Sequence, residues 1–210
     1  MNNNYSILRE QEYEELARLR LNGIVLDLGG SKKSGYHELF KGDYEIITAN
    51  IDPSYDCDLV FDIESKFPLD NEQYDFILCI NVLEHIYNYQ NVLKESSRVL
   101  KRNGTLILIT PFIFQIHESP DDYFRYSRSA LKRILEQNDF VITEIKELGY
   151  GLFSLIFQMI GGVIPFNVVR NVVKIGCIFL DRFFAKRSKK YTWLKYKIPL
   201  GYLTIAEKGE

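Results

Sequence analysis

Acidic residues and glycines follow two of the apolar runs in this sequence. Asp27, Gly29 and Gly30 come directly after the run 24–26, and Asp52 closes the run that begins at Tyr44. Paired glycines let a backbone approach a ligand where a Cβ would clash. A carboxylate at the end of a strand can accept hydrogen bonds from the two hydroxyls of a ribose. This pattern indicates a site for a nucleoside or nucleotide.

Two common nucleotide motifs do not fit the glycine turn. A phosphate-binding P-loop needs Gly-Lys-Ser/Thr after its second glycine. Gly30 and Gly35 have the right separation, but Tyr36 and His37 follow. A dinucleotide fingerprint needs GxGxxG, and the turn has no third glycine in position. His37 is expected to lie in a helix behind the turn and is assigned no role.

Apolar runs alternate with stretches of helical spacing along the chain. Strands are expected at 24–26, 44–51, 58–61, 76–80, 105–109, 141–148 and 201–208, and helices at 6–20, 36–40, 88–100 and 127–137. The helix at 88–100 is expected to stop at Asn103-Gly104. Such alternation predicts an α/β fold with a parallel sheet covered on both faces, whose ligands bind beyond the carboxyl ends of the strands.

Several segments, in this order, resemble the class I S-adenosylmethionine-dependent methyltransferases. The first strand ends in Asp27 and a glycine-rich turn, although the family's GxGxG is reduced to Gly-Gly-Ser-Lys-Lys-Ser-Gly. Residues 74–86, with their Leu-Glu-His triplet, look like the fourth strand and its turn, and residues 100–106 resemble the entry to the fifth strand. The resemblance is to the methyltransferase type 11 kind found in bacterial surface-polysaccharide gene clusters. It implies a Rossmann-like, seven-stranded, mostly parallel sheet with an antiparallel last strand. It also implies S-adenosylmethionine as cofactor and S-adenosylhomocysteine as product.

The resemblance also implies which residues contact the cofactor. Asp52 would meet the ribose hydroxyls, and Asp62 would meet the adenine amino group. The full expected set is Asp27, Gly29, Gly30, Ser31, Asp52, Pro53, Asp62, Ile63 and Asn81. Lys32 and Lys33 depart from the family pattern. They either reach the methionine carboxylate or are solvated, and we expect them to be solvated.

The segment 111–129 follows the fifth strand and resembles a block found in many bacterial methyltransferases of this type. Methyl transfer to oxygen needs an in-line approach and removal of the hydroxyl proton. His117 is the leading candidate for the base, and His85 is the second. Arg125 is a candidate for holding a carboxylate or phosphate. Two alternatives stay open: Asp122 and Arg125 form an ion pair that pins the loop, and His85 hydrogen-bonds within the start of its helix.

No metal ion is expected. Cys57, Cys79 and Cys177 show no CxxC spacing, and acids and histidines do not cluster at ligand spacing along the sequence. The first four residues lack the basic start and apolar stretch of a signal peptide, which predicts a reduced, cytoplasmic setting.

Charge is distributed unevenly along the chain. Residues 149–210 contain 10 basic and 3 acidic residues, and residues 1–148 contain 16 basic and 25 acidic, for a net charge of −2. The near-neutral total argues against nucleic acid as a partner. Residues 149–169 carry no charge, and an amphipathic stretch and a basic cluster follow up to residue 197. Such a section suits peripheral contact with an anionic bilayer at the inner face of the membrane. The alternative is a helical insertion that packs on the sheet or against a second subunit in a homodimer.

These observations predict one domain over residues 1–210. It would comprise a cofactor-binding core at 21–148, a helical insertion at 149–199 and a final strand at 200–208. The expected reaction is O-methylation of a sugar or nucleotide-sugar for a surface polysaccharide. The alternatives are a lipid-linked or quinone-type acceptor at the membrane surface, and a non-catalytic interaction module with the same fold.

Overall fold

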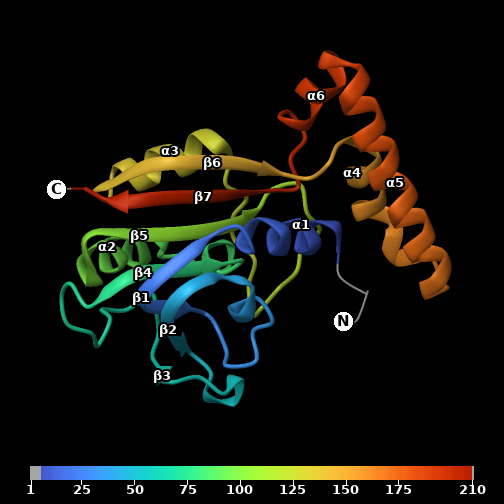
Figure 1. The fold of residues 1–210 in the computed structure, drawn as a ribbon. Coiled ribbons are helices and arrows are strands. Elements are labelled where there is room, and N and C mark those ends of the chain that lie inside the picture. Colours follow the sequence, from blue (N-terminus) through green and yellow to red (C-terminus); the bar gives the residue numbers. More distant parts are fainter. Residues whose placement is uncertain (1–5, 210) are drawn as a thin grey trace.

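A computed structural model describes residues 6–209 and contains a seven-stranded sheet (Figure 1). The strand order is β3-β2-β1-β4-β5-β7-β6. β7 is antiparallel to both of its neighbours, and the pairings among β1 to β5 are all parallel. The predicted Rossmann-like sheet with an antiparallel last strand is therefore confirmed. The strands are β1 (Arg20–Leu28), β2 (Lys41–Asn50), β3 (Leu59–Val60), β4 (Tyr74–Ile80), β5 (Leu100–Pro111), β6 (Phe140–Leu148) and β7 (Gly201–Lys208).

Helices cover both faces of the sheet, as predicted. One buried cluster lies between the sheet and the helices α2 (Tyr89–Val99) and α3 (Arg128–Glu136). A second lies on the opposite face, under α1 (Ile7–Leu16) and α4 (Leu152–Ile160). Because β1, β4 and β5 are buried on both faces, they read in the sequence as near-continuous apolar runs.

Two predicted boundaries are wrong. The expected helix at 36–40 is only the short 3₁₀ turn η1 (His37–Leu39), because the side chains of Tyr36 and His37 both turn inward to Asp27. The strand expected to start at 105 already starts at Leu100, which pairs with Tyr74 in the sheet. The helix expected at 88–100 is confirmed as α2, but it ends at Val99 and Asn103-Gly104 does not stop it. Asn103 instead takes a positive φ of 60° inside β5, beside a register shift.

The section between β6 and β7 forms its own helical layer, beyond the carboxyl ends of the parallel strands (Figure 1). We call this side of the sheet its carboxyl edge. The layer contains α4, the turn η4 (Gly161–Val163), α5 (Asn167–Arg187) and α6 (Lys189–Lys195). Within residues 6–209, no helix has both the length and the apolarity needed to cross a membrane.

The helix α1 fastens this helical layer to the sheet. Glu15 accepts from Lys146 of β6 at 2.5 Å, and Gln11 accepts from the backbone of Gly149. Farther along, Glu10 pairs with Lys174 of α5. One helix therefore contacts the sheet, the start of the insertion and its longest helix. Residues 1–5, for which the sequence predicted no signal peptide, lie outside the described part of the chain.

Candidate functional site

The first strand places Asp27 in the interior at its carboxyl end. Its Oδ2 accepts hydrogen bonds from the Tyr36 hydroxyl at 2.8 Å and from His37 Nε2 at 2.6 Å. Its Oδ1 is buried and has no hydrogen-bond partner among the described residues. Burial raises the pKa of Asp27, and the hydrogen bond from His37 opposes that rise. One carboxylate oxygen beneath the glycine turn is thus buried without a hydrogen bond among the described residues.

The two glycines of the turn are required by contacts within the chain. A Cβ on Gly30 would lie 2.0 Å from Asp27 Oδ2. Gly29 has a φ of +74°, and a Cβ there would lie 2.5 Å from a methyl carbon of Val82. Ser31 follows in a local turn, where its backbone N–H donates to Ser34 Oγ at 3.1 Å. The pair therefore lets the turn close over Asp27 and β4.

The second strand is followed by an exposed carboxylate. Asp52 Oδ1 accepts from the backbone N–H of Ser54 at 2.8 Å, ahead of Pro53 at the start of η2 (Pro53–Tyr55). This hydrogen bond lowers the pKa of Asp52. The side chain is open to solvent just beyond the end of β2.

Two other expected cofactor residues serve the local fold. Asp62 accepts from the backbone N–H of Glu64 at 2.8 Å and from Ser65 Oγ at 3.1 Å, and Ile63 is buried in the core. The Asp62 carboxylate therefore stabilises its own turn in this structure.

Asn81 also has a partner within the chain. It has a positive φ of 53° just after β4, and its Nδ2 donates to both carboxylate oxygens of Glu12 at 3.1 Å. Burial raises the pKa of Glu12, which lies in α1. Asn81 therefore connects α1 to the carboxyl end of β4.

Lys32 and Lys33 are exposed but paired. Their ammonium groups lie 2.6 Å from Asp58 and 3.8 Å from Asp56, in the connection between β2 and β3. The two lysines tie the glycine turn to that connection.

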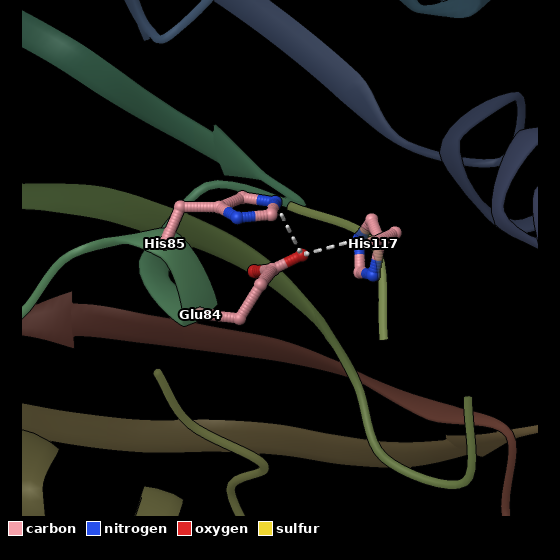
Figure 2. A group of neighbouring side chains, drawn as sticks. All are labelled: Glu84, His85 and His117. Carbon is pink, nitrogen blue, oxygen red and sulfur yellow. Dashed lines mark ion pairs between the residues drawn. The ribbon is translucent and has the colours of Figure 1, made fainter. Parts of the chain in front are cut away.

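Three chemically active side chains meet at the ends of β4 and β5 (Figure 2). Glu84 and His85 lie in η3 (Leu83–His85), and His117 lies in the loop after β5. Glu84 Oε1 is 3.8 Å from His85 Nε2 and 3.7 Å from His117 Nε2. The backbone carbonyl of Glu84 accepts from the N–H groups of Tyr123 and Phe124, which holds the loop against η3.

The Glu84 side chain is 0% exposed, yet neither carboxylate oxygen has a hydrogen-bond partner among the described residues. The His85 and His117 rings lie 4.9 Å apart, edge to face. The Glu84 carboxylate raises the pKa of His117, with a smaller opposing effect from burial. We call these three residues the Glu84 cluster.

Arg125 forms the ion pair that the sequence left open as an alternative. Its guanidinium binds both carboxylate oxygens of Asp122, with a 2.6 Å contact from Nη2 to Oδ2. This pairing lowers the pKa of Asp122 to about 2. Asp122 also accepts from the backbone N–H of His117 at 3.0 Å. Arg125 therefore acts through Asp122 to fix the backbone at His117.

Sequence reasoning missed three of these residues. No role was expected for His37, which hydrogen-bonds the Asp27 carboxylate. Glu12 lies in α1, and the amphipathic pattern of that helix does not mark it as a contact of Asn81. Glu84 stood inside the quoted Leu-Glu-His triplet without a role. Tyr36 and His37 follow Asp27 by 9 and 10 residues. This close spacing was the signal in the sequence for the contact between His37 and Asp27.

Comparison with known proteins finds a methyltransferase family model in the first half of the chain. Residues 37–108 match the model of a family described as a methyltransferase domain. A 42-residue segment is 48% identical to an uncharacterized protein of Methanocaldococcus jannaschii, and covers 20% of this chain and 18% of that protein.

Two solved structures share the fold over nearly the whole chain. An S-adenosylmethionine-dependent methyltransferase from Archaeoglobus fulgidus is 17% identical, with a TM-score of 0.60 over 95% of this chain and 94% of that chain. The 4+2 cyclase SpnF is 14% identical, with a TM-score of 0.62 over 100% of this chain and 85% of that chain. These findings show that the chain has the fold of solved S-adenosylmethionine-dependent methyltransferases, and that residues 37–108 resemble a methyltransferase domain. The cyclase illustrates that one fold hosts several chemistries.

Proposed function

We propose that the protein transfers a methyl group from S-adenosylmethionine to a small-molecule acceptor at the carboxyl edge of its sheet. The observation that carries this proposal is the sequence of functional groups along that edge. Asp27 is the second-last residue of β1, Asp52 follows β2, and the Glu84 cluster follows β4 and β5. Because these strands are adjacent and parallel, their ends form one site with a cofactor end and an acceptor end.

The residues at the cofactor end fit the chemistry of S-adenosylmethionine. The buried, unpartnered Oδ1 of Asp27 suits an ammonium group, and the exposed carboxylate of Asp52 suits vicinal ribose hydroxyls. When bound, the cofactor supplies an electrophilic methyl group on its sulfonium. His37 and Tyr36 keep Asp27 in place by donating to its other oxygen.

The acceptor end supports O-methylation. His117 is partly exposed, and its Nε2 faces the Glu84 carboxylate, which favours proton uptake at that nitrogen. A pocket of about 190 Å³ lies beside the same loop and is lined by Gln115, Arg170 and Lys174, among others. We propose a sugar hydroxyl, such as that of a nucleotide-sugar, as the methylated group.

Calorimetry with S-adenosylmethionine and S-adenosylhomocysteine tests the proposal. Asp52→Ala should weaken binding by about 1–3 kcal/mol, because charge-assisted hydrogen bonds to the ribose are lost. The matched control is Asp56→Asn, an exposed acid on the same turn, which should bind as the wild type does. Absence of cofactor binding at millimolar concentration would overturn the proposal and favour a non-catalytic module.

A second candidate is a lipid-linked acceptor, and one feature of α5 favours it. Four apolar side chains of α5 at helical spacing are 64–75% exposed: Val168, Val172, Ile175 and Phe179. We call them the α5 stripe. Exposed apolar residues gathered on one face mark an interaction surface.

Charge argues for an anionic bilayer as the occupant of this surface. The insertion at 149–199 contains nine basic residues and one acid, Asp181, which is buried. A second copy of the chain would bring like charges together, whereas anionic headgroups would be attracted. Flotation with anionic and neutral vesicles separates the outcomes: binding to anionic vesicles supports this candidate, and dimerisation without vesicle binding overturns it.

A further inference from the structure

We propose that Glu84, His85 and His117 bind a divalent transition-metal ion of the zinc type at the acceptor end of the site. The three residues come from two segments of the chain, and each offers one ligand atom. These atoms all lie within 4.8 Å of one another. Two imidazoles and one carboxylate form a ligand set typical of catalytic zinc and related ions.

The buried carboxylate of Glu84 calls for a cation. It is fully buried, and both of its oxygens lack hydrogen bonds within the described residues. Burying an ionised group without a partner is costly, so such groups in folded proteins are paired or coordinate metals. The Glu84 oxygen faces the two histidines at 3.7 and 3.8 Å, which is beyond hydrogen-bond distance.

The histidines present their unprotonated nitrogens to this carboxylate when they are neutral. His85 Nδ1 lies 2.6 Å from the backbone carbonyl of Asp121, and His117 Nδ1 lies 3.2 Å from that of Gln115. A carbonyl only accepts, so each Nδ1 carries the proton and each Nε2 carries a lone pair. Metal-ligating histidines are commonly held in this way by their other ring nitrogen.

The spacing leaves room for an ion between the three ligand atoms. Zinc bonds of about 2.0–2.2 Å in a tetrahedral site place ligand atoms roughly 3.3–3.6 Å apart. The two distances to Glu84 are slightly longer than this, and the three ligand atoms span up to 4.8 Å, so the two rings must move toward each other to complete the site. His117 is 37% exposed, which gives the ion a route from solvent.

Three protein ligands leave a fourth position open, as in catalytic zinc sites. Together with the proposed methyl transfer, on which this step rests, an acceptor hydroxyl in that position would release its proton to solvent water more readily. The two histidines would then act as ligands, and neither would serve as the free base. Metal binding itself does not depend on methyl transfer.

Cobalt provides a direct readout of the site. Protein stripped with a chelator is titrated with Co²⁺, followed by its visible absorption, and the bound Co²⁺ is then displaced with Zn²⁺. Wild-type protein should bind one equivalent, and Mg²⁺ should not compete because it prefers oxygen ligands. Glu84→Gln and His117→Ala should each weaken binding by about 100-fold or more, since both remove a direct ligand.

The third histidine of the chain supplies the matched control. His37 contacts Asp27 and lies outside the Glu84 cluster, so His37→Gln should bind Co²⁺ as the wild type does. Zn²⁺ should raise the melting temperature of wild-type and His37→Gln protein but not that of Glu84→Gln. If Glu84→Gln does not fold, His85→Ala replaces it in the same comparison.

The possible outcomes separate this proposal from methyl transfer. A wild-type protein that binds S-adenosylmethionine but no Co²⁺ or Zn²⁺ would overturn the metal site and leave the proposed function standing. One equivalent of metal retained by all cluster variants would place the ion elsewhere and would also overturn it. Metal binding without cofactor binding would support the site and contradict the proposed function.

Discussion

The carboxyl edge of the sheet buries polar atoms, whereas the insertion at 149–199 exposes apolar side chains. Among the described residues, the edge buries carboxylate oxygens of Asp27 and Glu84 that accept no hydrogen bond. The insertion exposes the apolar side chains of the α5 stripe. Buried polar groups and exposed apolar patches are the two informative exceptions to the usual partition of residues.

The contrast shows that each region is completed by a different kind of partner. Unpaired oxygens in the interior need a cation or a hydrogen-bond donor of fixed geometry, which indicates a small ligand. An exposed apolar stripe with basic neighbours fits a partner that offers a broad apolar area and negative charge, which indicates an extended surface such as a bilayer. The two regions meet at α1, where Glu12 reaches Asn81 while Glu10 reaches Lys174.

The largest effect is expected on vesicle binding. The double change Val172→Asp and Phe179→Asp should weaken binding to anionic vesicles by about 100-fold or more, because two apolar side chains no longer leave water. Vesicle flotation at low salt measures it. Val141→Asp is the control, since this exposed apolar residue lies on β6, outside the insertion. If Val141→Asp weakened vesicle binding equally, the insertion would not be the surface that binds the bilayer.

The next effect concerns the stability of the insertion. Asp181 of α5 accepts from the N–H groups of Phe153 and Ser154, at 3.0 and 2.8 Å, and from the Tyr191 hydroxyl. It caps α4, whose own N-cap residue, Gly151, has no side chain. Asp181→Ala should destabilise the fold by about 2 kcal/mol, because two backbone donors are left unpaired. Urea unfolding measures the loss, and Asp181→Asn should recover part of it. Unchanged stability would mean that α4 is held by packing alone.

The smallest effect lies beside the glycine turn. Lys32 lowers the pKa of Asp58 to about 2, so the carboxylate stabilises the fold at neutral pH and loses that contribution as the pH falls toward 2. Because Asp58 is partly exposed, Asp58→Asn should cost only about 1 kcal/mol at pH 7, and less near pH 2. Urea unfolding at the two pH values measures this difference. Asp43→Asn, an exposed acid of β2, should change stability by less than about 0.5 kcal/mol.

The sequence predicted the sheet well because its strands are marked locally. Apolar runs located the core strands of the sheet, and the last strand was placed at 201–208, where β7 lies. The elements that went wrong depend on contacts between distant residues. Asn103-Gly104 has the chemistry of a helix stop, but pairing of Leu100 with Tyr74 starts the strand earlier.

The sequence predicted where the candidate site lies in the fold, but it did not predict the contacts among its side chains. Asp27, Asp52, His85 and His117 all lie at the expected edge of the sheet. The Glu84 cluster was invisible because ligand spacing was sought along the chain, whereas His117 approaches Glu84 only through the fold. The burial of Glu84 could not be predicted either, because no residue near the Leu-Glu-His triplet in the sequence indicates that its side chain is shielded from solvent.

The position of β7 between β5 and β6 has a consequence for folding. Among the described strands, β6 pairs with β7 alone, so β6 joins the sheet only when residues 201–208 have inserted beside β5. The whole insertion must first be looped out or folded, and closing such a long loop carries an entropic cost that slows folding. Until then β5 and β6 each present an unpaired edge to other chains. The β5–β7–β6 seam therefore joins three strands through contacts of long sequence separation, which we expect to form late in folding.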